Sequence, residues 1–440
     1  MPQTVRWSRR LVLTAEALFG VFLVLVLGTH ADTLRTGPFT WLPLYRIALP
    51  SDTFVLGVLG LLPIAWSLAW LGSRYHNARW WRWGHRSLTL PLAVLSLWAV
   101  LDLSPGMTAS GLKALISLWL IWLVYLYVIN ERPRLVLPFV VVIVLQSLIG
   151  IGQVWKQSDL GLWWLGEYRL DPQASGVLVV AANGQRWLRA YGLAGGPNAL
   201  GATLSLLLVM ILPTALRAQG RRLWVFSAVL TLGLIGLLAS FSRSAMLALA
   251  LGLVVWGGLA LWRGRRIEWD RQRIIALGLP LLLGLLFLIA NSSALETRFF
   301  RLNSPLEARS LSERQRDLDV TVQLVQAAPL RGVGFGNINA AVRAVDPGAD
   351  VVHSAPLLVA AELGLVGVAL WAWVVLAGLW RSFRLSPWHL ALWVTALVPS
   401  FFGPWWMTIS WRATLLLGIV AGMTAAIPPH RFTDNDPNAS

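Results

Sequence analysis

The sequence has 440 residues, of which 57% are hydrophobic and 13% charged, whereas soluble domains are about a quarter charged. This composition excludes an ordinary soluble protein and indicates an integral membrane protein, while the absence of cysteine excludes disulfides and thiolate metal sites. The net charge is +16, but the arginines are spread over many short connections, which fits membrane orientation and not nucleic-acid binding.

A helix needs about 20 mostly apolar residues to cross a bilayer, because all its backbone polar groups must be satisfied within the segment. Twelve runs meet this requirement, and we predict an all-α integral membrane protein with about 12 transmembrane helices. The predicted spans are 10–29, 52–72, 87–104, 111–129, 135–156, 197–216, 223–240, 244–262, 274–291, 355–380, 387–403 and 411–428. The domain organisation expected is one polytopic membrane domain, 1–430, and a disordered cytoplasmic tail, 431–440.

The first run also resembles a signal peptide, since Thr29, His30 and Ala31 form a loose cleavage site; the length of the apolar run favours an uncleaved span. Arginines fall in alternate connections, and the positive-inside rule makes that side, with both termini, the cytoplasm. These arginines are Arg6, Arg9, Arg10, Arg74, Arg79, Arg82, Arg86, Arg132, Arg134, Arg217, Arg221, Arg222, Arg263, Arg265, Arg266, Arg271, Arg273, Arg381 and Arg384.

Two external loops, 157–196 and 292–354, are long enough to carry structure of their own. In the second, Leu318, Val322 and Val325 recur at helical spacing. Ser312 is the predicted N-cap and Pro329 lies beyond the predicted end. We therefore expect a helix in this loop, lying along the external membrane surface.

A glycine turn and two carboxylates follow that helix. Gly332, Gly334 and Gly336 form a G-x-G-x-G without a preceding strand, which is weak evidence for a nucleotide loop and favours a turn back to the membrane. Asp346 and Asp350 flank a Pro-Gly turn at a spacing that a hard cation could use, although turn chemistry is the commoner reason for such a pair. We predict no metal site and no cofactor.

Cations at the external ends of two spans suggest a phosphate site. Arg189 precedes Pro197, which is well placed to open a helix, and Asn198 adds a donor where a phosphate would meet the helix N-terminus. Arg243 lies in a tight turn between two apolar spans, where a charge at the bilayer edge indicates a functional partner, with snorkelling to lipid head groups as the alternative.

His353 is the only histidine in either external loop and lies directly before a span. A solvated loop histidine is the commoner explanation, but a group that titrates near neutral pH suits proton transfer at this edge. Glu362, about two turns into that span, is an intramembrane carboxylate, and such groups usually have a partner. We expect it to pair with one of the external arginines.

Read in order, the segments "RAYGLAGGPNALG", "SFSRSAM", "RQRDLDVTVQLVQAAPLRGVGFGN" and "HSAPLLVAAELGLVG" resemble the O-antigen ligase and O-antigen polymerase superfamily over about residues 185–370. The residues that fall on the family's pattern are Arg189, Pro197, Asn198, Ser242, Arg243, Arg314, Pro329, Gly332, Gly334, His353, Glu362 and Gly364. Ser354 and Leu318 depart from it, since the family often has asparagine and an aromatic residue there.

The resemblance implies a bacterial inner-membrane glycosyltransferase of GT-C-like architecture that uses a polyprenyl (undecaprenyl) diphosphate-linked glycan as donor. It also implies an active site on the periplasmic face and an acceptor hydroxyl, on lipid A-core in lipopolysaccharide biosynthesis. Arg189 and Arg243, with Arg314, would bind the diphosphate, and His353 would remove or orient the acceptor proton. The expected reaction is metal-independent and inverts the anomeric centre.

Two alternatives stay open at this stage. A repeat-unit polymerase shares the same motifs, so ligase is only slightly preferred. A secondary transporter would also have twelve spans, but it predicts repeated halves and interrupted helices near the midplane, and neither is evident. Gly418 and Gly422 form a G-x-x-x-G that serves packing within one subunit as readily as dimerisation.

Overall fold

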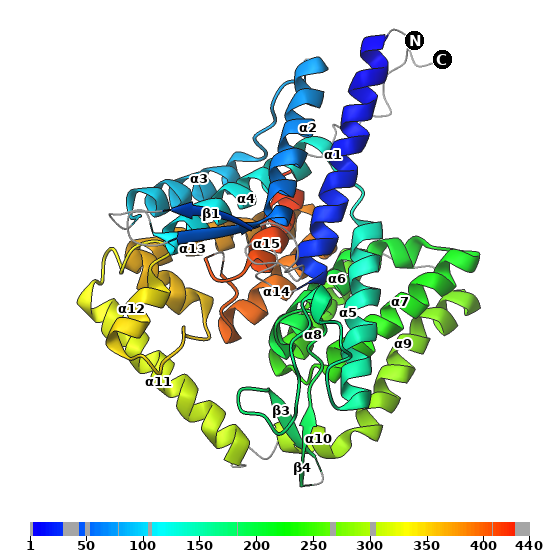
Figure 1. Ribbon diagram of the computed structural model, residues 1–440. Helices are drawn as coiled ribbons and strands as arrows, with labels where there is room; N and C mark the ends of the chain where they lie inside the picture. Colours follow the sequence, from blue (N-terminus) through cyan, green and yellow to red (C-terminus); the bar gives the residue numbers. More distant parts are fainter. Residues whose placement is uncertain are drawn as a thin grey trace.

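The computed structural model describes residues 3–29, 44–48, 53–77, 79–103, 108–182, 184–264, 270–299, 305–406 and 408–426. Within these residues the protein has fifteen α-helices, two short 3-10 helices (Val58–Leu61 and Trp163–Leu165) and two antiparallel hairpins (Figure 1). The predicted tail, 431–440, lies outside the described residues.

Eight of the described helices are long and apolar enough to cross a membrane. They are α1 (Gln3–Gly28), α4 (Ala109–Glu131), α5 (Val136–Lys156), α6 (Pro197–Arg217), α7 (Gly220–Ala239), α8 (Arg243–Trp262), α9 (Arg271–Ala290) and α13 (Ala355–Leu385). Three further apolar helices are shorter: α3 (Arg86–Leu101), α14 (Pro387–Phe402) and α15 (Trp411–Ala425). The helical membrane architecture is confirmed, and every predicted span overlaps a helix, but twelve full-length spans are not found.

The predicted span 52–72 is the main error. Its first residues form strand β2 (Thr53–Gly57), which pairs antiparallel with β1 (Leu44–Ala48), and the helix α2 is confined to Leu62–His76. Hydropathy averaged over a window does not separate a strand from a helix, and Pro63, in the first turn of α2, is the residue that marks the true start.

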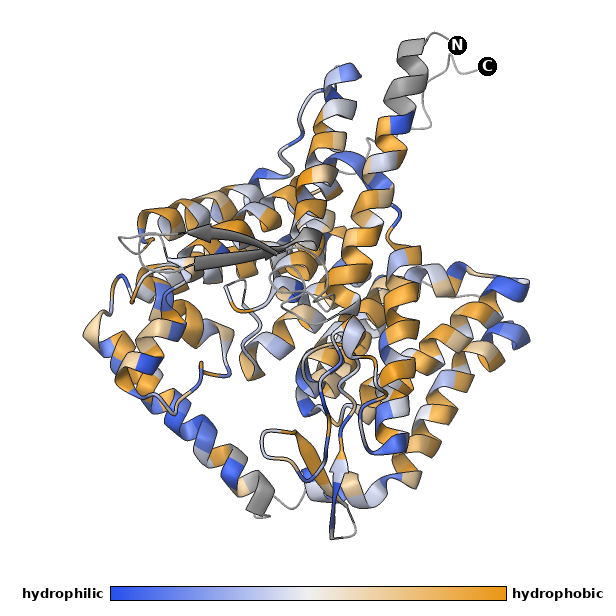
Figure 2. Cartoon of the chain, viewed as in Figure 1, coloured by the Kyte–Doolittle hydropathy of each residue, from blue (hydrophilic) through white to orange (hydrophobic). Residues whose placement is uncertain are grey.

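Close helix packing holds α15 against α4. Gly418 and Gly422 on α15 lie against α4, where an added Cβ would meet Val124 at 3.2 Å and Val128 at 2.9 Å. The G-x-x-x-G therefore packs within the subunit. The hydrophobic surface of α9 is largely exposed in the isolated chain, as Leu282 (54%) and Ile289 (61%) show, and lipid is the solvent that such a surface requires (Figure 2).

The helix predicted in the second long loop exists but begins earlier than expected. It is α11 (Pro305–Ala327), which is largely hydrophilic and runs between α10 (Ser292–Phe299) and α12 (Ile338–Val345) at one edge of the molecule (Figures 1 and 2). Ser312 is not its N-cap, because this hydroxyl lies inside the helix and donates to the carbonyl of Arg309. The helix does end before Pro329, as predicted.

The glycine turn after α11 docks into a break in α13, which confirms its reading as a turn. Gly364 has a non-helical backbone (φ 67°), so α13 is interrupted there. The N–H of Val333 donates to the carbonyl of Ala361 (2.8 Å), and the N–H of Leu365 donates to the carbonyl of Pro329 (2.8 Å). These bonds satisfy backbone groups that the break leaves without helical partners.

The helix order gives the molecule two chemically different ends. Helices α6, α8, α13 and α15 begin, and α7 and α14 end, beside the long loop regions that contain β3 (Val179–Ala182), β4 (Gln185–Leu188) and α11. The opposite ends carry exposed arginines such as Arg221 and Arg222. This alternation is the one that the arginine distribution predicted.

Candidate active site

Arg189 organises the ends of α6 and α7. It is 2% exposed; its Nε donates to the carbonyl of Ser240 (2.8 Å) and its Nη2 to Oδ1 of Asn198 (2.9 Å). The guanidinium thus fixes the α7–α8 turn and orients the Asn198 side chain in the first turn of α6. Pro197 opens that helix, as predicted.

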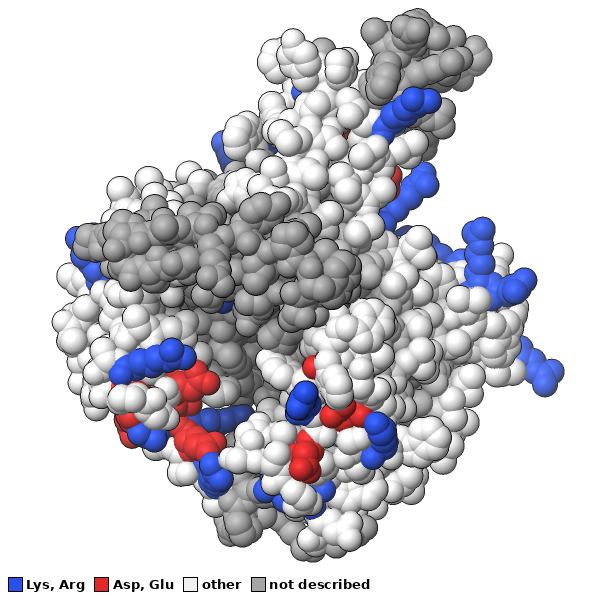
Figure 3. Space-filling model, in the orientation of Figure 1, with Lys and Arg blue, Asp and Glu red and all other residues white. Residues whose placement is uncertain are grey.

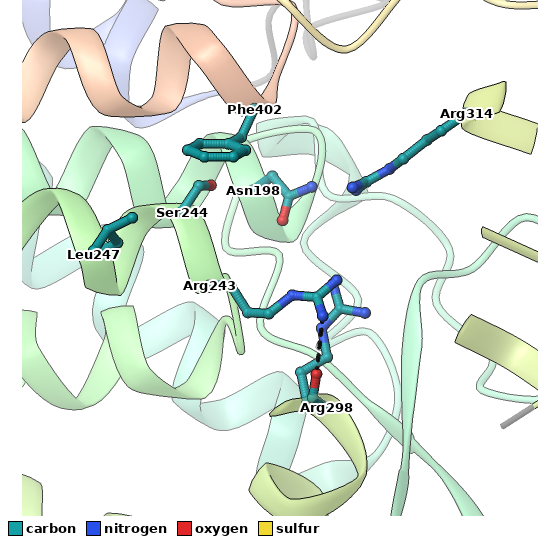
Figure 4. A pocket seen from close by; sticks show the side chains of 7 residues that line it. All are labelled: Asn198, Arg243, Ser244, Leu247, Arg298, Arg314 and Phe402. Atoms are coloured by element: carbon teal, nitrogen blue, oxygen red, sulfur yellow. Dashed lines mark hydrogen bonds between the residues drawn. The ribbon is translucent and has the colours of Figure 1, made fainter. Parts of the chain in front are cut away.

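Beside this turn lies the arginine cavity, of about 350 Å³, lined by Asn198, Arg243, Ser244, Leu247, Arg298, Arg314 and Phe402 (Figure 4). Arg243 comes from the first turn of α8 and donates from Nη1 to the carbonyl of Arg298 on α10 (3.1 Å). Arg314 reaches toward Asn198 from α11 on the other side (Figure 4). Three guanidinium groups from separate elements therefore face one space, and none of the described residues that line it is a carboxylate.

His353 lies in the loop before α13, with Asp317 of α11 beside it. Nδ1 of His353 is 3.7 Å from Oδ2 of Asp317, longer than a hydrogen bond, while Oδ1 of Asp317 accepts from the N–H of Asp350 (2.9 Å). The carboxylate thus holds the loop that carries the histidine. Burial lowers the pKa of His353 and the charge of Arg314 lowers it further, while Asp317 and Asp350 oppose them. The balance favours the neutral imidazole near neutral pH.

A second space, the loop cavity of about 640 Å³, brings these groups together. Its lining includes Arg189, Asn198, Arg314, Asp317 and His353. On the face that Figure 3 shows, acidic and basic side chains gather on both sides of a hollow in the lower half of the view. All the sequence-predicted residues except Arg243 and Glu362 therefore line this cavity, and Arg243 lines the arginine cavity next to it.

A third space, the Arg412 cavity of about 580 Å³, adjoins the other two. It shares Asn198 with both, His353 with the loop cavity, and Ser244 with the arginine cavity. Asn198 therefore lies where the three spaces meet, and His353 lies between the loop cavity and the Arg412 cavity.

One predicted pairing is wrong. Glu362 is fully buried and accepts hydrogen bonds from Nε1 of Trp406 (2.9 Å) and Oγ1 of Thr408 (3.1 Å), so its described partners include no arginine. Its role is to tie α13 to the α14–α15 loop. Asp346 forms a two-bond ion pair with Arg316 and accepts from the N–H of Gly348 (2.9 Å), which agrees with the turn chemistry expected of it. Within the described ranges, no group of three or more His, Asp or Glu side chains is placed to hold a metal ion.

Three site residues were missed at the sequence level. Arg298 was one of several loop cations, and only the return of α10 to the α8 turn distinguishes it. Asp317 is buried (5%) because the inward face of α11 is centred on Asp317, Val320 and Leu324. Of the predicted hydrophobic positions, Leu318 and Val325 pack partly buried beside this face, whereas Val322 is exposed (39%). Asp317, Val320 and Leu324 stand at i, i+3 and i+7, the helical spacing that marks this face in the sequence. Arg412 stands one residue inside α15 and resembles an ordinary boundary cation.

The fold and these cavities define a multi-pass membrane protein with a cationic, histidine-containing site at one end of its helices. Residues 226–372 match the family model Wzy_C, described as O-antigen ligase, which agrees with the resemblance that the motifs indicated. The matched stretch includes Arg243, Arg314 and His353, while Arg189 and Asn198 precede it. No curated protein gives a significant match to the chain.

Proposed function

We propose that this protein is an O-antigen ligase-like glycosyltransferase that moves a glycan from a polyprenyl diphosphate carrier to an acceptor hydroxyl. The observation that carries the proposal is the convergence of Arg243, Arg298 and Arg314 on one cavity that adjoins His353. The match of residues 226–372 to the O-antigen ligase family model supports the reaction class. GT-C-like architecture belongs to this proposal.

The arginines match the leaving group. When the bond between the anomeric carbon and the diphosphate oxygen breaks, the electron pair stays on the diphosphate, which gains negative charge. Guanidinium groups remain ionised and bind phosphate oxygens through two parallel hydrogen bonds. Because they are fixed before the reaction, they stabilise this charge in the transition state without reorganising. We assign Arg243, Arg298 and Arg314 to the diphosphate, with Arg189 orienting Asn198 as a further donor; no metal ion is required.

His353 fits the role of general base. A lowered pKa keeps its imidazole neutral at neutral pH, so a ring nitrogen is free to accept the proton of the acceptor hydroxyl as its oxygen bonds to the anomeric carbon. Asp317 limits the loss of basicity and stabilises the imidazolium that forms. A single displacement of this kind inverts the anomeric centre. An orienting role for His353 without proton transfer is the alternative.

We further propose that both termini are cytoplasmic and that the cavities open on the external face of a bacterial inner membrane. The positive-inside rule supports this orientation, since the helix ends away from the cavities carry Arg217, Arg221 and Arg222. A polyprenyl chain would then lie in the bilayer with its diphosphate at the arginine cavity.

Reconstitution with a purified donor tests the proposal. Protein in proteoliposomes is supplied with polyprenyl-diphosphate-linked oligosaccharide, with and without a lipid A-core acceptor, and products are resolved by mass. Transfer only when acceptor is present supports a ligase, whereas longer glycans on the carrier identify the polymerase alternative. The His353→Ala protein should bind donor yet lose transfer by roughly 10²–10⁴-fold, the usual contribution of a general base. Undiminished transfer by that protein excludes the assigned role.

A further inference from the structure

The Arg412 cavity has chemistry that transfer from a diphosphate carrier does not use. It lies between the ends of α14 and α15 and the segment before α6, and His353 is part of its wall. Trp405, Ile409 and Phe402 give it an apolar side, and Lys113 and Arg412 give it two cations. At about 580 Å³ it has room for a sugar residue with its substituents.

Arg412 is a buried cation that has no counter-ion among the described residues. It is 1% exposed, its Nε donates to the carbonyl of Val26 (3.2 Å), and its Nη2 donates to the carbonyls of Leu193 (2.7 Å) and Thr29. These acceptors are neutral, and no described residue forms an ion pair with the guanidinium. Its Nη1 has no hydrogen-bond partner in the described parts of the chain. A buried charge in this condition is costly unless an anion approaches it.

A second unmatched donor lies in the same wall. Nε1 of Trp405 is buried and also lacks a hydrogen-bond partner among the described residues. Lys113, from the first turn of α4, adds a second positive charge to the lining, in which Asp350 is the only carboxylate. Buried donors are normally paired, so two unpaired donors and two cations in one cavity point to an absent acceptor of hydrogen bonds that carries negative charge.

We propose that the Arg412 cavity holds the acceptor substrate, and that Arg412, with Lys113 and Trp405, binds an anionic group on it, a phosphate monoester or a carboxylate. The inference rests on the proposed function, because that function places the diphosphate at the arginine cavity and the reacting hydroxyl at His353. An acceptor that presents its hydroxyl to His353 has the Arg412 cavity beside it. The site therefore selects acceptors by charge.

Binding of three matched probes tests the inference without any transfer step. Hexyl glucoside, its 6-phosphate and hexyl glucuronide are titrated into the purified full-length protein, with inorganic phosphate as a fourth ligand. We expect both anionic glycosides to bind at least about tenfold more tightly than the neutral one, a difference of about 1.4 kcal/mol. Equal affinities overturn the inference. Binding of inorganic phosphate as tight as that of the glucoside phosphate overturns the assignment to an acceptor.

Three variants localise the effect. Lys113→Gln and Arg412→Gln should each bring the ratio of the affinities for the anionic and neutral probes closer to one. Arg412→Lys should restore part of the preference for the anionic probes. Lys156→Gln is the matched control, because Lys156 is exposed and does not line the cavity. If Arg412→Gln does not fold, Lys113→Gln decides the point, and an unchanged preference in that variant then overturns the assignment of the anionic group to this cavity.

The transfer reaction separates this inference from the proposed function. Glycan transfer from the polyprenyl diphosphate donor to the same probes should show the same preference in kcat/KM. Equal transfer to all three leaves the proposed function standing and overturns charge selection. If no donor supports transfer to any acceptor, including lipid A-core, the proposed function fails, and the binding titration still decides whether the cavity recognises anions.

Discussion

Arg243 illustrates how one side chain combines structure with charge. Its guanidinium is anchored by the carbonyl of Arg298, so the remaining N–H groups are directed by a fixed hydrogen bond. Lipid snorkelling, the alternative from the sequence, would not require an anchored side chain in a cavity with Arg298 and Arg314. The distinction concerns geometry and not charge, so it can be tested by a substitution that keeps the charge.

We expect Arg243→Lys to lower kcat/KM for glycan transfer by roughly 10- to 100-fold, since a hydrogen bond to a charged group contributes about 1.5–3 kcal/mol. An ammonium cannot donate two parallel bonds while keeping the bond to Arg298. Steady-state kinetics in proteoliposomes measure the effect. The control is Arg221→Lys, an exposed arginine at the opposite end of the bundle. Equal kinetics of both variants and the original protein indicate snorkelling.

Asp317 acts on His353 in two ways that pH separates. The pKa of His353 is lowered by burial, and the imidazole serves as a base only above that pKa, so the acid limb of kcat should lie below pH 6.5. The carboxylate of Asp317 raises this pKa, so Asp317→Asn should move the limb to still lower pH. It should also reduce the plateau, because the loop loses its anchor.

The pH–rate profiles of the original protein and Asp317→Asn are compared at saturating donor. A lower plateau with an unmoved acid limb assigns Asp317 a purely structural role. Asp319→Asn is the matched control, because this neighbouring carboxylate is exposed and does not face the histidine. Its profile should coincide with that of the original protein.

At the scale of elements, the glycine turn and the break in α13 form one unit. An added Cβ at Gly332 would lie 2.5 Å from the carbonyl oxygen of Ala361, and its φ of 76° is in the left-handed region. This unit connects α11, which carries Asp317 and Arg314, to α13, which follows His353. Its integrity therefore decides whether the two halves of the site meet.

We predict that Gly332→Ala destabilises the protein by about 1–3 kcal/mol, the cost of a strained backbone position. Thermal unfolding in detergent measures the loss. Gly258→Ala is the control, since that glycine lies within α8 with no atom within 4 Å of an added Cβ, and alanine favours a helix. A Gly332→Ala protein as stable as the original would show that the turn moves freely to accommodate the methyl group.

Sequence patterns predicted elements best where one physical rule dominates. Hydropathy located the eight long helices, and Pro197 and the Ser-Arg pair at Ser242 marked true helix starts. The β1–β2 hairpin was missed because pairing depends on a partner strand that hydropathy does not register. The inward face of α11 was only partly predicted because Asp317 is polar, and its burial depends on the His353 loop packed against it.

At the scale of the whole molecule, all the proposed chemistry depends on which side of the membrane the cavities face. If the cavities face the periplasm, residues on α11 and before β3 are external and the α6–α7 connection is cytoplasmic. The sequence contains no cysteine, so any introduced thiol is the only one in the protein. Single cysteines therefore report orientation without background.

We predict that Ser175→Cys and Ser312→Cys react in intact cells with a membrane-impermeant maleimide, because both serines are exposed in the external regions. Gln219→Cys, in the α6–α7 connection, should react only after the inner membrane is permeabilised. Protein mass after labelling gives the result, and transfer activity of each variant establishes that the fold is retained. Labelling of Gln219→Cys in intact cells, with Ser175→Cys protected, would place the cavities in the cytoplasm. A periplasmic acceptor could not then reach His353.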